Sequence, residues 1–139
     1  MTLENVELAR HGYEAFRTGR LEAVLEMMDP DIEWSEGVDV PEPQVYRGHD
    51  GVRRQQEQFE AAWESFELEA EEFIDAGDKV VVLLKIRARG RGSEIEIEGR
   101  AAHVWTVRDG KAIRLEMYID PARALEAAGV PRESPTTPD

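Results

Sequence analysis

The chain of 139 residues is long enough to bury one hydrophobic core, and its 17 basic and 30 acidic residues give a formal net charge of −13. A surface of this sign repels nucleic-acid phosphates and anionic lipid heads, so neither nucleic acid nor a membrane is expected as a partner. The absence of cysteine excludes disulfides and thiolate chemistry, and the absence of a signal peptide or a membrane-length apolar run predicts a cytoplasmic protein.

Two helices are predicted at the start of the chain. Apolar residues recur at three- and four-residue spacing over residues 3–18, and Gly19 follows where a left-handed helix cap belongs. A shorter apolar repeat over Leu21–Met28 predicts a second helix, which ends at Asp29-Pro30 because proline disfavours a helical residue before it.

Residues 31–36 alternate polar and apolar side chains, as a half-buried strand does. Ile32, Trp34 and Glu36 fall on one face, which places a carboxyl group on the apolar side of the strand. The proline-containing segment 38–43 is predicted to be a loop. A third helix is expected from Asp50, as its N-cap, to about residue 65. Its buried stripe comprises Val52, Phe59, Ala62, Trp63 and Phe66.

Four strands of an antiparallel meander are predicted next, over residues 66–74, 79–89, 94–108 and 111–119. On the outer face of this sheet, basic and acidic residues alternate along neighbouring strands. The basic set is Lys85, Arg87 and Arg89, and the acidic set is Glu94, Glu96 and Glu98. We expect cross-strand ion pairs between the two sets, which fix the register of the strands.

The last hairpin turns at Asp109-Gly110, a dipeptide typical of tight hairpin turns. Before the turn, one face carries Ala101, His103, Trp105 and Val107; after it, one face carries Ile113, Leu115, Met117 and Ile119. A histidine therefore lies in an apolar row, where its ring nitrogens need a polar partner.

A final helix is predicted to start with Asp120 as N-cap and Pro121 as first helical residue, and to end before Gly129. Residues 131–139 are polar and rich in proline, so we expect a disordered tail after a single domain of residues 1–130. Three helices, one strand and a four-stranded antiparallel meander make an α+β fold, in which a curved sheet wraps around the N-terminal helices.

Several short motifs in this order resemble those of a known family. They are Asp29-Pro30-Asp31-Ile32-Glu33-Trp34, Tyr46-Arg47-Gly48-His49-Asp50-Gly51-Val52, His103-Val104-Trp105 and Arg108-Asp109-Gly110-Lys111. Over residues 3–128 the chain resembles the SnoaL-like branch of the NTF2-like superfamily, which holds polyketide cyclases and ketosteroid isomerases. The resemblance implies an NTF2-like cone-shaped α+β barrel with a deep apolar pocket, no required cofactor, and a homodimer through the outer sheet face.

Matching the chain to this family carries roles to individual residues. Glu36 falls where the ketosteroid isomerases have their base, and His103 where they have an acidic oxyanion donor. His103 also matches a histidine of the polyketide cyclases. Two positions depart from the family: the isomerase tyrosine falls on Gly12, one residue before Tyr13, and the cyclase aspartate falls on Met117.

Two hypotheses of function follow. In the first, the protein is a cofactor-free isomerase, cyclase or lyase acting on an apolar carbonyl compound, with Glu36 as base, His103 as polarising donor and Tyr13 as a third catalytic group. In the second, it is a non-catalytic ligand-binding or dimerisation module. There Glu36 is an idle, solvated carboxylate and His103 a buried neutral histidine held by a tyrosine or a backbone carbonyl.

The expected ligand is a small apolar or aromatic molecule, because aromatic side chains are frequent on the inward faces. The expected ligand-binding residues are Trp34, Phe16, Phe59, Trp63, Trp105, Met117 and Ile119; ordinary core packing is the alternative for these side chains. The three histidines, His11, His49 and His103, lie on different elements without metal-ligand spacing, so no metal site is expected.

Overall fold

The computed structural model of the protein describes residues 2–92 and 95–130, and the predicted tail 131–139 lies outside these ranges. The described residues form four helices and six strands. The helices are α1 (Thr2–Arg17), α2 (Leu21–Glu26), α3 (Gly48–Ala62) and α4 (Pro121–Ala127); the strands are β1 (Met28–Glu36), β2 (Gln44–Arg47), β3 (Trp63–Ala76), β4 (Lys79–Gly90), β5 (Glu96–Arg108) and β6 (Lys111–Tyr118). None of these helices is long and apolar enough to cross a membrane.

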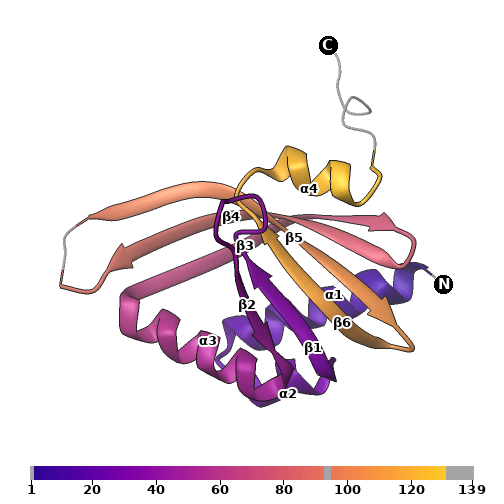
Figure 1. Ribbon diagram of the computed structural model, residues 1–139, viewed down its shortest axis with the longest axis horizontal. Helices are drawn as coiled ribbons and strands as arrows, with labels where there is room; N and C mark the ends of the chain where they lie inside the picture. The colour runs from indigo at the N-terminus through magenta and orange to yellow at the C-terminus, as the bar shows by residue number, and fades with distance from the viewer. Residues whose placement is uncertain (1, 93–94, 131–139) are drawn as a thin grey trace, which may run out of the picture.

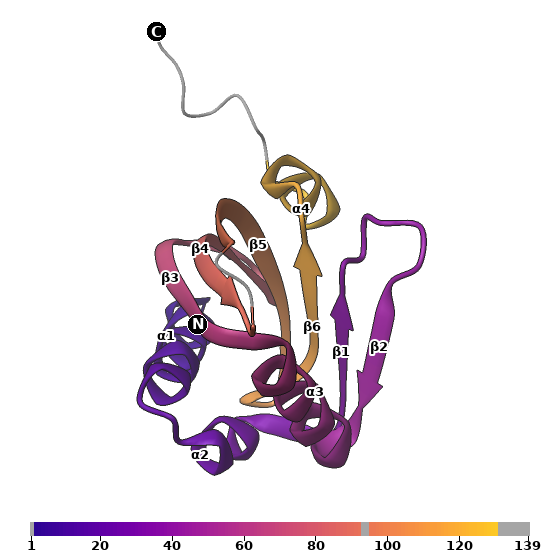
Figure 2. The same cartoon turned by 90° about the vertical axis from the view of Figure 1, so that its left-hand side faces the viewer.

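The six strands form one curved sheet in the order β2-β1-β6-β5-β4-β3. Neighbouring strands run antiparallel except β1 and β6, which are parallel. The sheet is open, with β2 and β3 at its two edges. Helices α1, α2 and α3 lie beneath it and α4 lies above it (Figure 1), and the turned view shows the strands arching over the three N-terminal helices (Figure 2). The predicted α+β class, with a curved sheet wrapped around the N-terminal helices, is confirmed.

Both faces of the sheet are covered at its centre. The core on the concave face, against α1 to α3, includes Leu25, Met28, Ile32, Trp34, Val52, Val80, Val82, Leu84, Trp105 and Leu115. On the convex face a smaller cluster gathers Val81, Ala102, Val104, Tyr118 and Ala124 beneath α4. Val80, Val81 and Val82 are all fully buried, which explains why the middle of β4 is apolar at every position rather than alternating.

The third helix differs from the sequence prediction at both ends. It begins at Gly48, which takes a left-handed φ of 72°, and the N-cap residue Arg47 makes no side-chain capping bond. Asp50 therefore lies inside the first turn and is not the N-cap. The helix ends before Trp63, whose φ of −119° and ψ of 130° already belong to a strand. An aromatic residue with high strand propensity pairs there with β4 instead of extending the helix.

The region before the third helix also differs. Helix α2 stops earlier than predicted, so β1 already starts at Met28 and includes Pro30. Proline gives no N–H to a sheet, and the pairing of β1 with β6 is interrupted between Met28 and Glu33. Residues 44–47, for which the sequence predicts no strand, form the short edge strand β2, which pairs with β1 from Glu36 opposite Gln44 onward.

The last hairpin turns as predicted, with φ of 54° at Asp109 and 76° at Gly110. One inward position was predicted wrongly. The register of β5 and β6 shifts after Thr106, so Ala112 lies opposite Val107 and enters the core in place of Ile113. A bulge of this kind moves the neighbouring side chain by one position and reverses the face it occupies.

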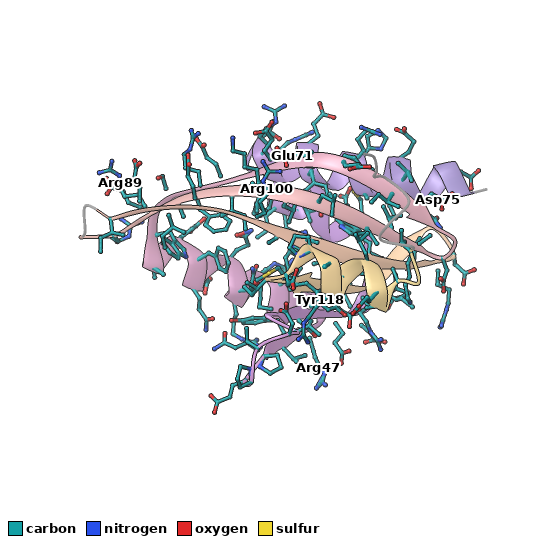
Figure 3. The ribbon with its side chains drawn as sticks, turned by 90° about the horizontal axis from the view of Figure 1, so that it is seen from above. Arg47, Glu71, Asp75, Arg89, Arg100 and Tyr118 are labelled. Carbon is teal, nitrogen blue, oxygen red and sulfur yellow. The ribbon has the colours of Figure 1, made fainter. Side chains whose placement is uncertain are left out.

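The outer face carries two of the expected cross-strand pairs, Arg87 with Glu98 at 3.1 Å and Arg89 with Glu96 at 2.9 Å. Lys85 instead lies opposite Arg100, whose Nη1 is 2.6 Å from Glu71 Oε1 on β3 (Figure 3). Glu94 is outside the described residues. These pairs are exposed, so each contributes at most about 1 kcal/mol to the stability of the fold. Their main effect is to fix the register of the strands.

The final helix forms as predicted. Asp120 Oδ1 accepts a hydrogen bond of 3.0 Å from the Ala122 N–H, and Pro121 is the first helical residue. Gly129 takes a φ of 77° just past the end of the helix, where a left-handed residue closes it. The position of α4 on the convex face follows from this start, because the helix leaves directly from the end of β6.

Candidate functional site

A small cavity lies between α1 and the concave face of the sheet. Its volume of about 20 Å³ is room for about one water molecule. The lining residues are Gly12, Tyr13, Phe16, Val24, Met28, Trp34, Leu68, His103, Trp105 and Leu115. The structure thus brings five of the residues predicted from the sequence, Tyr13, Phe16, Trp34, His103 and Trp105, to one place.

Three polar side chains at this cavity form a chain of hydrogen bonds. Trp105 Nε1 donates to Tyr13 Oη at 2.8 Å, and Tyr13 Oη lies 2.6 Å from His103 Nδ1. Trp105 Nε1 can only donate, so the Tyr13 hydroxyl accepts that bond. His103 Nδ1 is the acceptor found within reach of the hydroxyl proton among the described residues, so we assign that proton to the bond with Nδ1. This network assigns the ring proton of His103 to Nε2.

Burial controls the protonation of this chain. It lowers the pKa of His103, which is 4% exposed, to about 3, and raises the pKa of the Tyr13 phenol despite the bond from Trp105. Both side chains are therefore neutral near neutral pH. A neutral imidazole with its proton on Nε2 is a hydrogen-bond donor, whereas Tyr13, which has one proton and gives it to His103, is a positioning residue.

The close approach of the Trp105 indole to α1 depends on Gly12. A Cβ at this position would lie 2.7 Å from Cη2 of Trp105, closer than real Cβ contacts come. The missing side chain lets the Trp105 indole reach the Tyr13 hydroxyl of the next residue. Gly12 is the position where the isomerase tyrosine would fall, so the indole occupies the space that such a side chain would need.

Glu36 lies at the end of β1 on the concave side, the face that the strand alternation predicts. Its Oε2 accepts hydrogen bonds from Trp34 Nε1 and, at 3.1 Å, from Gln55 Nε2 of α3. Burial raises the pKa of the Glu36 carboxyl, and the bonds from Trp34 and Gln55 offset part of that rise. Glu36 is therefore a partly buried, hydrogen-bonded carboxyl group and not a freely solvated one.

Trp34 links Glu36 and His103. Its indole N–H points to Glu36, and its ring meets the His103 ring edge to face, with centroids 6.1 Å apart and planes at 78°. Glu36 is not among the residues that line the cavity. The two predicted catalytic groups thus contact the same tryptophan, but they do not face one common open space.

A larger groove lies outside the cavity, between α1 and β3. Its volume is about 790 Å³, within the range of roughly 300–1,000 Å³ that ligand pockets occupy. Tyr13, Phe16 and Leu68 line both the groove and the cavity, so the two spaces are adjacent at these three side chains. The rim of the groove is charged, with Arg10 placed 4.4 Å from the centre of the Phe73 ring.

The remaining predicted ligand-binding residues lie elsewhere. Phe59 and Trp63 line a separate groove and pack against Phe66, with the Phe59 and Phe66 centroids 4.9 Å apart. Met117 lies opposite His103 in the sheet but is not part of the cavity lining, and Ile119, past the end of β6, is 52% exposed. The structure does not bring these four side chains to the His103 cavity.

Several residues of the site were not predicted. Val24, Met28 and Leu68 form part of the apolar wall of the cavity. Gln55 donates a hydrogen bond to Glu36. A signal for Gln55 was present in the sequence, because it falls three residues after Val52 on the buried stripe of α3, where an apolar residue is expected. Of the other histidines, His11 is exposed and His49 Nε2 lies 3.1 Å from the Met28 carbonyl oxygen.

Comparison with known proteins gives the family. The model of the SnoaL-like domain matches residues 9–115. The chain belongs to the SnoaL-like family. Among curated proteins, none matches this SnoaL-like protein.

Solved structures show the same fold. An NTF2-like protein of unknown function from Burkholderia pseudomallei K96243 is 26% identical, with a TM-score of 0.76 over 88% of this chain and 95% of that one. The TerC protein, co-crystallised with polyporic acid, is 28% identical, with a TM-score of 0.75 over 91% and 98%. A candidate SnoaL-like polyketide cyclase from Jannaschia sp. CCS1, 18% identical, shares the fold with a TM-score of 0.74 over 94% of each chain.

Proposed function

We propose that this SnoaL-like protein binds a small, largely apolar molecule with a carbonyl oxygen and acts on it by cofactor-free acid–base chemistry. The observation that carries the proposal is the buried chain from Trp105 through Tyr13 to His103. It fixes a neutral histidine in an apolar cavity with Nε2–H as donor, an arrangement that binds an oxygen on which negative charge develops.

The proposed reaction is proton transfer next to the carbonyl group. Glu36 Oε1 takes a proton from the carbon beside the carbonyl, and the electron pair of the broken C–H bond moves to form an enolate. The enolate oxygen accepts a hydrogen bond from His103 Nε2. In a substrate with a double bond one carbon further along, the enolate is a conjugated dienolate, and return of the proton from Glu36 to the far carbon completes an isomerisation. In the cyclisation variant the enolate carbon attacks a second carbonyl of the same molecule, and the alkoxide formed takes the proton from Glu36.

The ligand reaches His103 from the outer groove. The groove is large enough for the body of a drug-sized molecule, and Tyr13, Phe16 and Leu68 line both the groove and the cavity. Phe16 and Leu68 are only partly buried, so their side chains can move aside. Trp34 must also shift, because its ring lies between His103 and Glu36. The 28% identity to a protein crystallised with polyporic acid supports an aromatic ligand class.

The test is exchange of ketone protons in heavy water. We expect the protein to catalyse exchange of the protons beside the carbonyl in at least one member of a panel of aromatic and alicyclic ketones, followed by NMR. Glu36→Gln lowers this rate by a factor of about 10²–10⁴ while binding is retained, because the amide cannot take the proton. Asp31→Asn, which changes an exposed carboxylate of the same strand, is the matched control. Equal exchange in Glu36→Gln ends the catalytic proposal.

A non-catalytic ligand-binding or dimerisation module is the second candidate. It is supported by the small size of the cavity and by the engagement of Glu36 Oε2 with Trp34 and Gln55. Under this alternative, phenols and ketones shift the His103 NMR signals without proton exchange. A homodimer through the outer sheet face would bury the charged pairs of that face, so sedimentation at low and high salt tests this interface: a salt-sensitive dimer supports it, and proton exchange decides between the module and the enzyme.

A further inference from the structure

One buried polar atom beside Glu36 has no hydrogen-bond partner among the described residues. Gln55 is 3% exposed, and its Nε2 donates to Glu36 Oε2 at 3.1 Å. Its Oε1 is buried, and no partner is found for it in the part of the chain that the structure describes. A buried amide oxygen left in this way is unfavourable, so its position beside a titratable group needs an explanation.

The two oxygens of Glu36 differ in their surroundings. Both N–H donors, from Trp34 and from Gln55, point to Oε2. An oxygen that accepts two hydrogen bonds serves as the carbonyl oxygen of a carboxylic acid. A proton bound to Glu36 therefore belongs on Oε1.

A primary amide and a carboxylic acid can pair through two hydrogen bonds. The amide N–H donates to the carbonyl oxygen of the acid, and the acid O–H donates to the amide oxygen. The first bond exists between Gln55 and Glu36. The second needs an acceptor on the same amide, and Gln55 Oε1 is that atom.

We propose that Gln55 stabilises Glu36 in its neutral, protonated form, with the Glu36 hydroxyl donating to Gln55 Oε1. The proton then satisfies the amide oxygen that the ionised carboxylate leaves unpaired. Gln55 is thus a positioning residue: it makes Glu36 a better proton acceptor by stabilising the product of proton uptake. This catalytic consequence rests on the proposed function, whereas the pairing itself does not.

The other groups around Glu36 do not replace this role. Tyr46 of β2 is close enough to feel the charge of Glu36, but its hydroxyl lies within 2.7 Å of Gln44 Oε1 and 2.6 Å of Gln58 Oε1. On β6, Glu116 lies opposite Ser35, whose side chain is on the other face of β1. His103 lies beyond Trp34 and is neutral.

No arginine, lysine or histidine forms a salt bridge with Glu36 among residues 2–92 and 95–130. Arg54 acts electrostatically on Tyr46, whereas burial, Trp34 and Gln55 are the causes of the pKa shift of Glu36. The ionised form of Glu36 is therefore favoured only by the two N–H donors, and the neutral form gains the additional bond to Gln55 Oε1.

The experiment is an NMR titration of carboxyl-labelled glutamate, with Glu36→Gln identifying the Glu36 signal. Gln55→Met keeps the side-chain length and burial but removes both amide atoms. We expect the titration midpoint of Glu36 to fall in Gln55→Met. If Gln55 acted only as a donor to the carboxylate, its loss would raise the midpoint instead, and a rise or an unchanged midpoint overturns the proposal.

Gln58→Met is the matched control, because Gln58 lies on the same helix, is exposed and contacts Tyr46 rather than Glu36. The titration midpoint of Glu36 in Gln58→Met is expected to equal that in the wild type. If Gln55→Met does not fold, the infrared spectrum of the wild type minus that of Glu36→Gln tests the pairing of Glu36 with Gln55 without this variant. The carbonyl band of protonated Glu36 is expected at the frequency of a doubly hydrogen-bonded acid, and a band of a free acid group contradicts the pairing. Neither readout requires turnover, so failure of the proposed reaction and failure of this pairing are distinguishable.

Discussion

The chemistry available at His103 depends on which of its ring nitrogens carries the proton. The Tyr13 hydroxyl is 2.6 Å from Nδ1 and receives a bond from Trp105, so its own proton goes to the imidazole. Nε2 is then the donor that remains for a ligand. One hydroxyl group thereby decides whether the histidine donates or accepts at the cavity.

Replacing Tyr13 by phenylalanine removes this control. Both Nδ1 of His103 and Nε1 of Trp105 lose their partner, so we expect the free energy of unfolding to fall by about 1–3 kcal/mol in urea denaturation. The nitrogen NMR signals of His103 are expected to show a mixture of tautomers. Tyr46→Phe is the control, since the Tyr46 hydroxyl bonds to the exposed side chains of Gln44 and Gln58 and to neither His103 nor Trp105. Equal losses in both variants would contradict the role of Tyr13.

Stability is also expected to depend on the absence of a side chain at Gly12. A methyl group there meets Trp105 at 2.7 Å, so Gly12→Ala overfills the contact between α1 and β5 and destabilises the protein by about 1–3 kcal/mol. We expect a lower Tm and a shifted tryptophan fluorescence spectrum. Gly99→Ala is the control, because no atom lies within 4 Å of the Cβ it would add. An unchanged Tm in Gly12→Ala would show that Trp105 can move at no cost.

At the scale of elements, the loop after β1 is tied to the end of the last hairpin. The Val38 N–H donates to the Met117 carbonyl at 2.9 Å, and the Asp39 carboxylate accepts from the backbone N–H groups of Ile119 and Asp120 at 2.9 Å each. These bonds extend the parallel pairing of β1 with β6 and position the start of α4. The segment predicted as a loop thus ties the end of β1 to the end of β6.

Asp39→Ala tests this connection. Burial raises the pKa of Asp39, but the N–H groups of Ile119 and Asp120 lower it more, so the net pKa is lowered. A carboxyl with a lowered folded pKa contributes stability above its unfolded value, and that contribution is lost as the pH falls. We expect Asp39→Ala to lose about 1 kcal/mol of unfolding free energy at neutral pH and less in acid. Asp31→Ala, at an exposed carboxylate of β1, is expected to change little, and a similar loss there would rule out the specific role.

For the whole molecule, the buried histidine determines how stability depends on pH. Folding lowers the pKa of His103 from 6.5 to about 3, so between these values the unfolded chain binds a proton that the folded protein does not. Stability contributed by the neutral ring is complete above pH 6.5 and falls with decreasing pH by ~1.4 kcal/mol per unit. Glu36 acts in the opposite direction, since its raised pKa favours the folded state at low pH.

The measurement is urea unfolding from pH 7 to pH 4 for the wild type and for His103→Gln, which has no titrating ring. The difference between the two slopes isolates His103 from Glu36 and from the other carboxylates. We expect the wild type to lose stability more steeply as the pH decreases. Parallel slopes would mean that His103 is solvated and titrates as a model imidazole.

Much of the fold could be predicted because it is encoded in local patterns. Alternation placed Glu36 on the concave face and His103 in an apolar row, and the Asp109-Gly110 turn and the Asp120-Pro121 helix start were read from adjacent residues. The helix boundaries at Gly48 and Trp63, the strand β2 and the bulge at Ala112 were not predicted. Each of these depends on a partner strand or on a backbone conformation that a local pattern does not contain.

Composition and local patterns specify the α+β class, the charge, the inward faces and the residue types available at the site. How these residues meet follows from the packing of the elements. This packing placed the Tyr13 hydroxyl, 90 residues away in the chain, on His103, and it put Trp34 between that histidine and Glu36. It also left Gln55 Oε1 without a partner beside Glu36. Periodicity fixes the face on which a side chain lies, whereas distances across the core follow from packing several elements at once.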